Sequence, residues 1–274
     1  MTTYIAVISG PATTLSPGVS ARGSAVPEEE ENSVFNYVDT ASGRAGIGAL
    51  TERLAQDRVA IIGLGGTGGY ILDLVAKTPV LEIRLFDGDD FLSHNAFRGP
   101  GAPSLDELRE VPLKVDHWAT IYTRMRKGII PHAIAIDASN ADLLDGVTFA
   151  FICIDNGPSK KAVIAKLEKI GVSFIDVGMG LQLDDGSLGG ILRVTTSTPE
   201  KRDHVHGGRI DFSDHQGQDI YATNIQVADL NALNAIMAVI KWKKLCGFYR
   251  DLEREHHSTY TTDGNMLLNR DQAC

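Results

Sequence analysis

The stretch VAIIGLGGTGGYILDLVAK, residues 59–77, decides the fold of this chain. It begins as an apolar run typical of a buried strand, passes through a glycine-rich turn and continues with a helical pattern. Glycines in such a turn let backbone N–H groups approach a phosphate at the N-terminus of the following helix. The stretch therefore predicts a nucleotide-binding strand–turn–helix unit built on Gly63, Gly65, Gly66 and Gly68.

Further strand-like and helical segments alternate after this unit. Alternation of this kind predicts parallel strands joined by crossover helices, in a doubly wound, Rossmann-like α/β sheet. After Gly180 the pattern changes, and an Asp-Gly pair between two strand-like runs predicts an antiparallel extension. The tail STYTTDGNMLLNRD is expected to add one edge strand. The expected parallel strands are RVAIIG, EIRLFD, HAIAID, GVTFAFICID and VSFIDVG.

The chain is expected to hold one folded domain, residues 34–274, preceded by an irregular arm. Residues 1–33 contain three prolines, several glycines and a run of glutamates that we interpret as solvated surface. Residues 197–220 are polar and predict a surface loop. The segment NIQVADLNALNAIMAVIKWKKLCGFY predicts a long helix, over about residues 224–248, that packs on the sheet.

Composition excludes several classes of protein. A net charge of −9 leaves no basic excess to neutralise phosphates, which argues against a general nucleic-acid binder. The apolar run from Leu230 to Ile240 is too short to span a bilayer, and the N-terminus lacks the pattern of a signal peptide. The three cysteines are isolated, without the spacing of a zinc knuckle or disulfide framework. We therefore expect a cytoplasmic protein.

Acidic residues follow the second strand. Asp87 closes that strand 19 residues beyond Gly68, where its carboxylate can accept hydrogen bonds from ribose hydroxyls. Asp89 follows two residues later. Because enzymes that bind NAD and enzymes that bind ATP both use these parts, the glycine turn and its acidic partner leave the nucleotide undecided.

Four later residues favour ATP. Asn95 and Arg98 are spaced to lie on one face of a helical turn beside the ribose carboxylate, where both can contact a polyphosphate. Lys114 adds a cation near the carboxyl edge of the sheet, and Asp155 ends a strand there, placed to hold Mg²⁺. Read singly, Arg98 is a surface ion-pair residue, Lys114 a solvated helix residue and Asp155 a helix N-cap. Together they suit attack at the α-phosphate, where preplaced cations offset charge on the leaving pyrophosphate.

The order of these motifs resembles the adenylation domain of the ThiF/MoeB/ubiquitin-activating-enzyme superfamily. The resemblance covers roughly residues 58–180 and the late helix. More narrowly, FDGDDFLSHNAFRGPGA together with NIQVADLNALNA is similar to ThiF-like proteins of bacterial ubiquitin-like conjugation operons. The resemblance implies that the glycines line the phosphates, Asp87 and Asp89 lie at the nucleotide, Asn95, Arg98 and Lys114 hold the polyphosphate, and Asp155 binds Mg²⁺.

The resemblance also implies an activity and partners. It implies an adenylyltransferase that uses ATP and Mg²⁺ to activate the C-terminal carboxylate of a ubiquitin-like or sulfur-carrier protein, and that passes the acyl group on to a conjugating-enzyme homologue or another nucleophile. Residues 195–223 would form the loop that crosses over the carrier's tail. Family members are commonly homodimers in which an N-terminal Arg reaches the partner's ATP; Arg44 is our candidate here, and Arg53 the second.

The chain departs from the family pattern in its cysteines. It lacks paired CxxC motifs, and residues 195–223 contain no Cys where ubiquitin-activating members place a catalytic one. We expect Cys153 to be a small buried hydrophobe and Cys246 to pack near a helix end; Cys274, the last residue, is a weak thioester candidate. The simplest reading is an acyl-adenylate that is transferred directly.

Other readings remain open at this stage. His204, His206 and His215 form a loose zinc signal without an evident fourth ligand, and a loop that orders on partner binding explains them more simply. His256 and His257 are expected to carry no function. The rival functions are an NAD-dependent oxidoreductase and a catalytically silent scaffold of an activating-enzyme heterodimer. A small-molecule or tRNA-directed member of the superfamily is also open, although the acidic charge disfavours tRNA.

Overall fold

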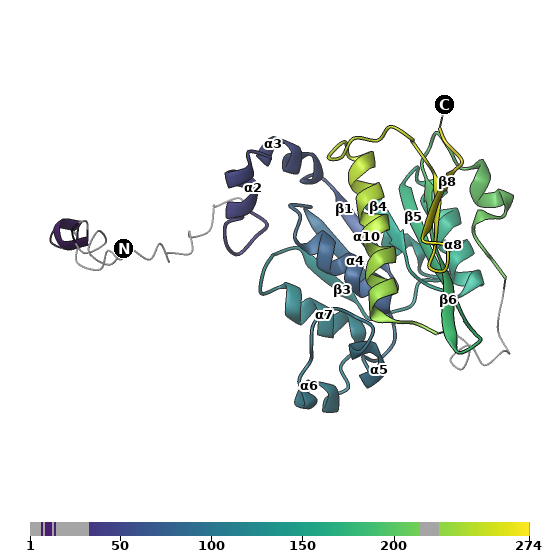
Figure 1. The fold of residues 1–274 in the computed structure, drawn as a ribbon, viewed down its shortest axis with the longest axis horizontal. Coiled ribbons are helices and arrows are strands. Elements are labelled where there is room, and N and C mark those ends of the chain that lie inside the picture. The colour runs from purple at the N-terminus through teal and green to yellow at the C-terminus, as the bar shows by residue number, and fades with distance from the viewer. Residues whose placement is uncertain (1–6, 8, 13, 15–32, 214–224, 274) are drawn as a thin grey trace.

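The computed structural model describes residues 7, 9–12, 14, 33–213 and 225–273 (Figure 1). Its eight-stranded sheet has the order β3-β2-β1-β4-β5-β6-β7-β8. The first five strands are parallel and the last three antiparallel, which confirms the predicted Rossmann-like architecture with an antiparallel extension. The strands are β1 (Arg58–Ile62), β2 (Glu82–Phe86), β3 (Ile129–His132), β4 (Phe149–Ile152), β5 (Ser173–Asp184), β6 (Ser187–Ser197), β7 (His257–Thr261) and β8 (Met266–Arg270).

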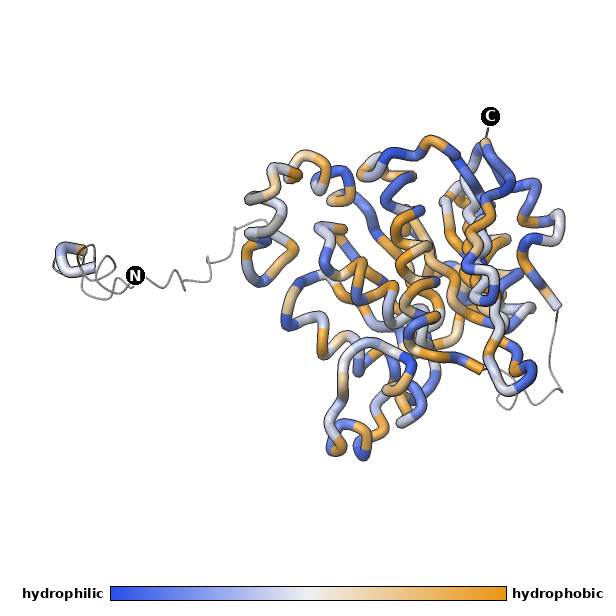
Figure 2. Tube along the Cα trace, in the orientation of Figure 1, coloured by the Kyte–Doolittle hydropathy of each residue, from blue (hydrophilic) through white to orange (hydrophobic). Residues whose placement is uncertain are grey.

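Helices cover both faces of the sheet. One face carries α4 (Gly66–Ala76), α7 (Lys114–Tyr122) and α10 (Ala228–Leu245), which meet the strands in a core that includes Trp118 and Trp242. The other face carries α8 (Gly157–Lys169), η2 (Ala141–Leu144) and the short π-helix η3 (Val205–Arg209) over a second core. Figure 2 shows hydrophobic residues gathered along the middle of α10 and the strands beneath it. Among the described residues, no helix combines the length and apolar character needed to cross a bilayer.

Short helices stand at opposite ends of the sheet (Figure 1). The segments α2 (Thr40–Ala45), α3 (Gly48–Thr51) and η1 (Glu52–Leu54) precede β1 and lie at its amino end. The buried Arg126 fixes the start of the domain, because it donates to the carbonyls of Thr78, Val80 and Lys127 and lies over the ring of Phe35. The segments α5 (Ser93–Ala96) and α6 (Leu105–Arg109) follow β2, at the carboxyl edge.

The antiparallel extension is longer than predicted. β5 continues eight residues beyond Asp176, its last residue paired with β4, and returns as β6 through a turn in which Asp185 and Gly186 have φ of 43° and 75°. This is the expected Asp-Gly turn, since both positions need the left-handed region. The tail forms two strands, β7 and β8, rather than one, because its Asp263-Gly264 turn closes a second hairpin.

Two further expectations were wrong in detail. The segment HAIAID contributes only its first residue to a strand: β3 begins at Ile129, so the apolar residues that follow His132 lie outside the sheet. Residues 197–220 were expected to form a surface loop, yet His204 and Val205 are buried beneath the second face of the sheet. The long helix was placed correctly, with α10 spanning Ala228–Leu245 inside the predicted range.

Candidate active site

The glycine turn joins β1 to α4, and protein packing leaves no room for a Cβ at three of its glycines, Gly63, Gly66 and Gly68. Gly63 has φ of +90°, and a Cβ there would lie 2.6 Å from the carbonyl oxygen of Cys153. A Cβ on Gly68 would overlap the carbonyl oxygen of Gly63. These glycines hold the turn tightly against the start of the segment that follows β4.

Gly65 and Gly66 have different surroundings. A Cβ on Gly66 would overlap the Asn231 amide and lie 2.8 Å from the carbonyl oxygen of Arg98. A Cβ on Gly65 would meet nothing within 4 Å. Gly65 is also the N-cap of α4 and provides no side-chain cap for the first-turn N–H groups. The open space at Gly65, beside the positive end of an 11-residue helix, is therefore where a phosphate can approach the backbone.

Asp87 fixes the turn from the neighbouring strand. Its Oδ2 accepts from the N–H of Leu64 at 2.7 Å, and its Oδ1 accepts from the N–H of Asp89 at 2.9 Å. The side chain is buried, so these contacts orient the carboxylate as well as the loop. Asp87, the residue predicted to bind the ribose, thus lies directly against the glycine turn.

Lys114 is buried at the first position of α7, so its interpretation as a solvated helix residue was wrong. Its Nζ lies 2.6 Å from Asp89 Oδ2 and 3.4 Å from Asp87 Oδ1. The exposed Asp89 carboxylate is the closer partner. When a polyphosphate binds, Lys114 can give up its contact with the exposed Asp89 carboxylate and contact the phosphate oxygens instead.

Asn95 and Arg98 lie in one turn, as predicted. Asn95 is buried in α5, its Oδ1 accepts from the N–H of Leu92 at 2.9 Å, and its Nδ2 is buried without a hydrogen-bond acceptor among the described residues. The N–H of Arg98 donates to the carbonyl of Asn95 at 3.2 Å. Burial lowers the pKa of His94, and the charges of Arg98 and Lys114 lower it further. Both cations therefore lie close enough to the His94 imidazole to act on it.

Asp155 is exposed, three residues beyond the end of β4. Its interpretation as the cap of α8 was wrong, because Asn156 is the N-cap and accepts from the N–H of Ser159 at 2.9 Å. Burial raises the pKa of the adjacent Cys153 thiol, and the charges of Asp176 and Asp155 raise it further. The prediction that Asp155 ends the strand was wrong, because β4 stops at Ile152; Asp155 lies in the turn that follows, whose first residues, Cys153 and Ile154, lie against Gly63.

Neither of the two cysteines within the described residues, Cys153 and Cys246, has surroundings that favour a reactive thiolate. Cys153 is partly buried and packs on the core, as expected. Cys246 is also partly buried, and burial together with the nearby Asp57 carboxylate raises its pKa. A thiol needs a lowered pKa to act as a nucleophile, so neither environment favours a thioester. Cys274 lies outside the described residues.

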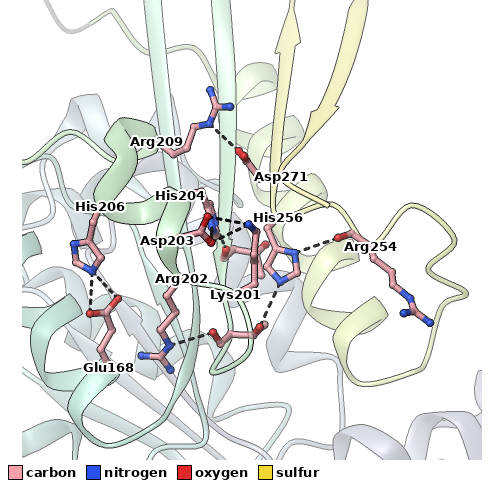
Figure 3. Close-up of polar contacts among 12 residues, drawn as sticks. Glu168, Lys201, Arg202, Asp203, His204, His206, Arg209, Arg254, His256 and Asp271 are labelled. Carbon is pink, nitrogen blue, oxygen red and sulfur yellow. Dashed lines mark hydrogen bonds and ion pairs between the residues drawn. The ribbon is translucent and has the colours of Figure 1, made fainter. Parts of the chain in front are cut away.

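The described histidines after β6 contact protein groups (Figure 3). His204 contacts the carbonyl of Thr196 through Nε2 at 2.8 Å, and His206 pairs with Glu168. His256 and His257, expected in a polar stretch, are buried. His215 lies outside the described residues. Within those residues, no three His, Cys, Asp or Glu side chains are grouped as a metal site requires.

The loop predicted at residues 195–223 begins with the last three residues of β6 and continues through η3. Its segment at Phe212 and Ser213 passes over the start of α8, since a Cβ on Gly157 would overlap the carbonyl oxygen of Ser213. The chain thus reaches the carboxyl edge beside Asp155 before residues 214–224, which lie outside the described residues.

The two N-terminal arginines lie away from this edge. Arg44 belongs to α2, and Arg53 donates through Nη1 to the carbonyl of Gly247, after α10. Both precede β1, whereas the glycine turn follows it. Neither segment adjoins the chain's own glycine turn.

Sequence reasoning missed one residue that joins these parts. Asn231, in the first turn of α10, accepts from Thr67 Oγ1 at 2.8 Å and donates to the carbonyl of Arg98 at 3.4 Å. It is almost fully buried. An Asn on the apolar face of a helix was the available signal, because a buried amide requires partners.

Comparisons with known proteins agree with this fold. The family model described as ThiF family matches residues 40–252, and a model described as a domain of unknown function, DUF6791, matches residues 1–40. A tRNA threonylcarbamoyladenosine dehydratase of Haemophilus influenzae is 26% identical over 140 residues, which are 48% of this chain and 53% of that protein. The match thus spans about half the length of that relative.

Solved structures share the fold. The crystal structure of E. coli MccB with MccA-N7isoASN has a TM-score of 0.65 at 15% identity, covering 86% of this chain and 73% of that one. The structure of PaaA has a TM-score of 0.61 at 17% identity, covering 81% and 75%. MccB has also been solved with ATP, with a TM-score of 0.60 at 16% identity, covering 82% and 66%.

Proposed function

Because the chain belongs to the ThiF family, we propose that it is an ATP- and Mg²⁺-dependent adenylyltransferase that activates the C-terminal carboxylate of a ubiquitin-like or sulfur-carrier protein. A carboxylate oxygen attacks the α-phosphorus of ATP and forms an acyl–phosphate bond. The bond from that phosphorus to the β-phosphate oxygen breaks, and pyrophosphate leaves with the electron pair. The carboxylate is ionised at pH 7, so the reaction needs no general base.

The observation that carries this proposal is the convergence of the open glycine turn with two cations. Gly65 leaves room for a phosphate. Lys114 lies against Asp87, whose carboxylate accepts from the N–H of Leu64 in the turn, and the backbone of Arg98 lies against Gly66. Cations at this place offset the charge that develops on phosphorus and on pyrophosphate. A hydride-transferring enzyme has little use for them, which disfavours the NAD-dependent alternative. Their presence also disfavours a silent scaffold.

Asp155 suits Mg²⁺ bound together with phosphates. Mg²⁺ takes oxygen ligands and is usually held by one or two carboxylates plus substrate phosphates and water. Asp155 offers one exposed carboxylate at the carboxyl edge, and the described residues hold no group of three metal-ligating side chains. The donor set therefore fits an ion shared with ATP and does not fit a metal held by protein alone. Such an ion would supply charge stabilisation to the phosphates.

The acyl-adenylate is passed on directly in this proposal, to a conjugating-enzyme homologue or another nucleophile. The raised pKa values of Cys153 and Cys246 support transfer without a thioester on either. A homodimer would let Arg44 or Arg53 serve the partner's ATP, since neither adjoins the glycine turn of its own chain. Arg44 remains the first candidate because Arg53 is already bonded to Gly247.

A second candidate is a tRNA-directed reaction. It is favoured by the 26% identity to a tRNA threonylcarbamoyladenosine dehydratase, and it would use the same glycine turn of this chain. The net charge of −9 stands against it, because tRNA binding gains most of its affinity from cations.

Transfer of label from α-³²P-ATP tests the proposal. Purified ubiquitin-like and sulfur-carrier proteins are each added with Mg²⁺, beside the same proteins carrying a C-terminal amide. The proposal predicts an acid-stable, hydroxylamine-sensitive acyl-AMP on a carrier with a free carboxylate and none on its amide. Label that moves to added tRNA, and to no carrier, would favour the second candidate.

A further inference from the structure

A buried ion triad, made of Lys160, Asp176 and Arg193, lies beside the site and takes no part in the contacts at the glycine turn. Asp176 is fully buried in β5. Its Oδ1 lies 3.0 Å from Lys160 Nζ, and its Oδ2 lies 2.6 Å from Arg193 Nη2. Two cations thus surround one carboxylate, which leaves the triad with a surplus positive charge.

The register places the triad at the carboxyl edge. Asp176 pairs with Ile152, the last residue of β4, and Lys160 lies in the first turn of α8. Arg193 pairs with Gly178, on the part of β5 that extends past the end of β4. The turn from β4 to α8, which carries Asp155, therefore leaves the sheet at the same edge as all three residues.

Arg193 is the member of the triad that a ligand can reach. Its side chain is 21% exposed, whereas those of Lys160 and Asp176 are 6% and 0% exposed. The guanidinium lies against Gly178, where a Cβ would be 2.6 Å from Nη2, and Nη1 donates to Thr195 Oγ1 at 2.8 Å. The group is therefore fixed in orientation and has further N–H groups beyond these two contacts.

The adenylation reaction needs a place for a second anion. Lys114 and Arg98 stand on the β1–β2 side of Asp155, where the phosphates approach. The triad stands on its β5–β6 side, close to the chain that passes over α8 at Ser213. The attacking carboxylate must reach the α-phosphorus from a side that the polyphosphate does not fill. A fixed guanidinium recognises a carboxylate well, because its planar N–H groups match the two oxygens.

We propose that Arg193, held by Asp176 and supported by the charge of Lys160, binds the terminal carboxylate of the acyl substrate and orients it toward the α-phosphate. This inference rests on the proposed function and names the carboxylate subsite of that reaction. Asp176 acts as a positioning residue, because it contacts the guanidinium and not the substrate. Lys160 raises the positive charge at the subsite without being reached by the ligand.

Binding of glycylglycine tests the subsite directly. This dipeptide is a minimal chain end with a free carboxylate, and glycylglycinamide is its neutral counterpart. Calorimetric titrations use protein saturated with Mg²⁺ and α,β-methylene-ATP, which cannot be cleaved at the α-phosphate. The variants are Arg193→Gln, Arg193→Lys and, as a control, Arg84→Gln. Arg84 is a strand residue of similar exposure, 20%, in an ion pair with Glu82 on β2.

We expect wild-type protein to bind the dipeptide and not its amide. Arg193→Gln should weaken dipeptide binding about tenfold or more, while affinity for the nucleotide analogue stays unchanged. Arg193→Lys keeps a charge against Asp176, so it should fold even if the Gln variant does not, and it should bind with intermediate affinity. Arg84→Gln should bind the dipeptide as wild type does.

Four results would overturn the inference. They are equal dipeptide affinity in Arg193→Gln and wild type, equal binding of dipeptide and amide, no saturable dipeptide binding to nucleotide-loaded wild type, and a loss of nucleotide affinity in Arg193→Gln. The last would assign Arg193 to the phosphates. Failure of wild type to bind the nucleotide analogue would instead refute the proposed function, and the subsite with it.

Discussion

The glycine turn allows a sharp separation between folding and ligand binding. Gly65 and Gly68 are three residues apart, yet a Cβ on Gly65 meets nothing within 4 Å while one on Gly68 overlaps a backbone oxygen. Gly65 has φ of −69° and ψ of −157°, a conformation that Ala can adopt. We therefore predict that Gly65→Ala folds normally and binds nucleotide more weakly, whereas Gly68→Ala is unstable with or without nucleotide.

The sizes follow from the contacts. In Gly65→Ala the smaller entropy of the unfolded chain and the poorer N-cap oppose each other, so the free energy of unfolding should change by less than about 0.5 kcal/mol. A methyl group where a phosphate approaches should lower Mg·ATP affinity about tenfold or more, which is about 1.4 kcal/mol. Gly68→Ala must move backbone and should cost about 3 kcal/mol or more. At about 2–4 °C per kcal/mol for a chain of this size, its Tm should fall by about 6–12 °C.

Thermal unfolding of the two variants with and without Mg·ATP measures both effects. Wild type and Gly65→Ala should have nearly the same Tm without nucleotide. With Mg·ATP at about 100 times the wild-type Kd, wild type should gain about 2.7 kcal/mol and a variant that binds tenfold more weakly only about 1.4 kcal/mol. If Gly65→Ala binds Mg·ATP as tightly as wild type, no phosphate approaches Gly65 and the reasoning fails. A Gly68→Ala variant as stable as wild type would refute the packing argument.

Further variants and conditions test other parts of the structure. Lys114→Gln should weaken Mg·ATP binding about tenfold in a titration, because it removes a charge-assisted contact to the polyphosphate, and unchanged affinity would separate Lys114 from the nucleotide. Arg126→Met leaves buried carbonyls without donors and should cost about 3 kcal/mol in urea unfolding; a cost below about 1 kcal/mol would contradict this anchoring role. Burial, with the charges of Arg209 and Arg193, lowers the pKa of His257 to about 4. Between about pH 6.5 and 4 the unfolded chain therefore binds more protons at His257 than the folded protein does. The contribution of His257 to the free energy of unfolding is complete above about pH 6.5 and is lost as the pH falls. The loss should reach up to about 2 kcal/mol from pH 7 to pH 5. His257→Gln should flatten that decline in urea titrations, and an equally steep decline in the variant would show that other groups cause it.

The sequence predicted the parts of the fold that depend on local pattern. Strand, glycine turn and helix at residues 58–76 carry their own periodicity, and the Asp185-Gly186 turn carries its own backbone requirement. The position of Asp87 followed from the same pattern, because parallel strands end at one edge. These features needed no knowledge of distant contacts.

Features set by tertiary contact were not predictable. Lys114 resembles any charged residue at the start of a helix, and only the fold shows that two carboxylates enclose it. His204 lies in a polar stretch, yet η3 packs it beneath the sheet. Asp176 and Arg193 are 17 positions apart and meet only because β5 and β6 pair in one register. Single-residue chemistry could not reveal that pairing.

Binding of Mg·ATP compared with NAD is the most direct test of the central claim that the glycine turn holds ATP. Thermal unfolding is followed for wild type and Asp155→Ala, each with either ligand. A ligand at about 100 times its Kd adds about 2.7 kcal/mol, which should raise the Tm by several degrees. We predict a rise in Tm with Mg·ATP that Asp155→Ala weakens, and no rise with NAD. A rise with NAD alone would identify a redox enzyme and contradict the account, and no rise with either ligand would favour a scaffold.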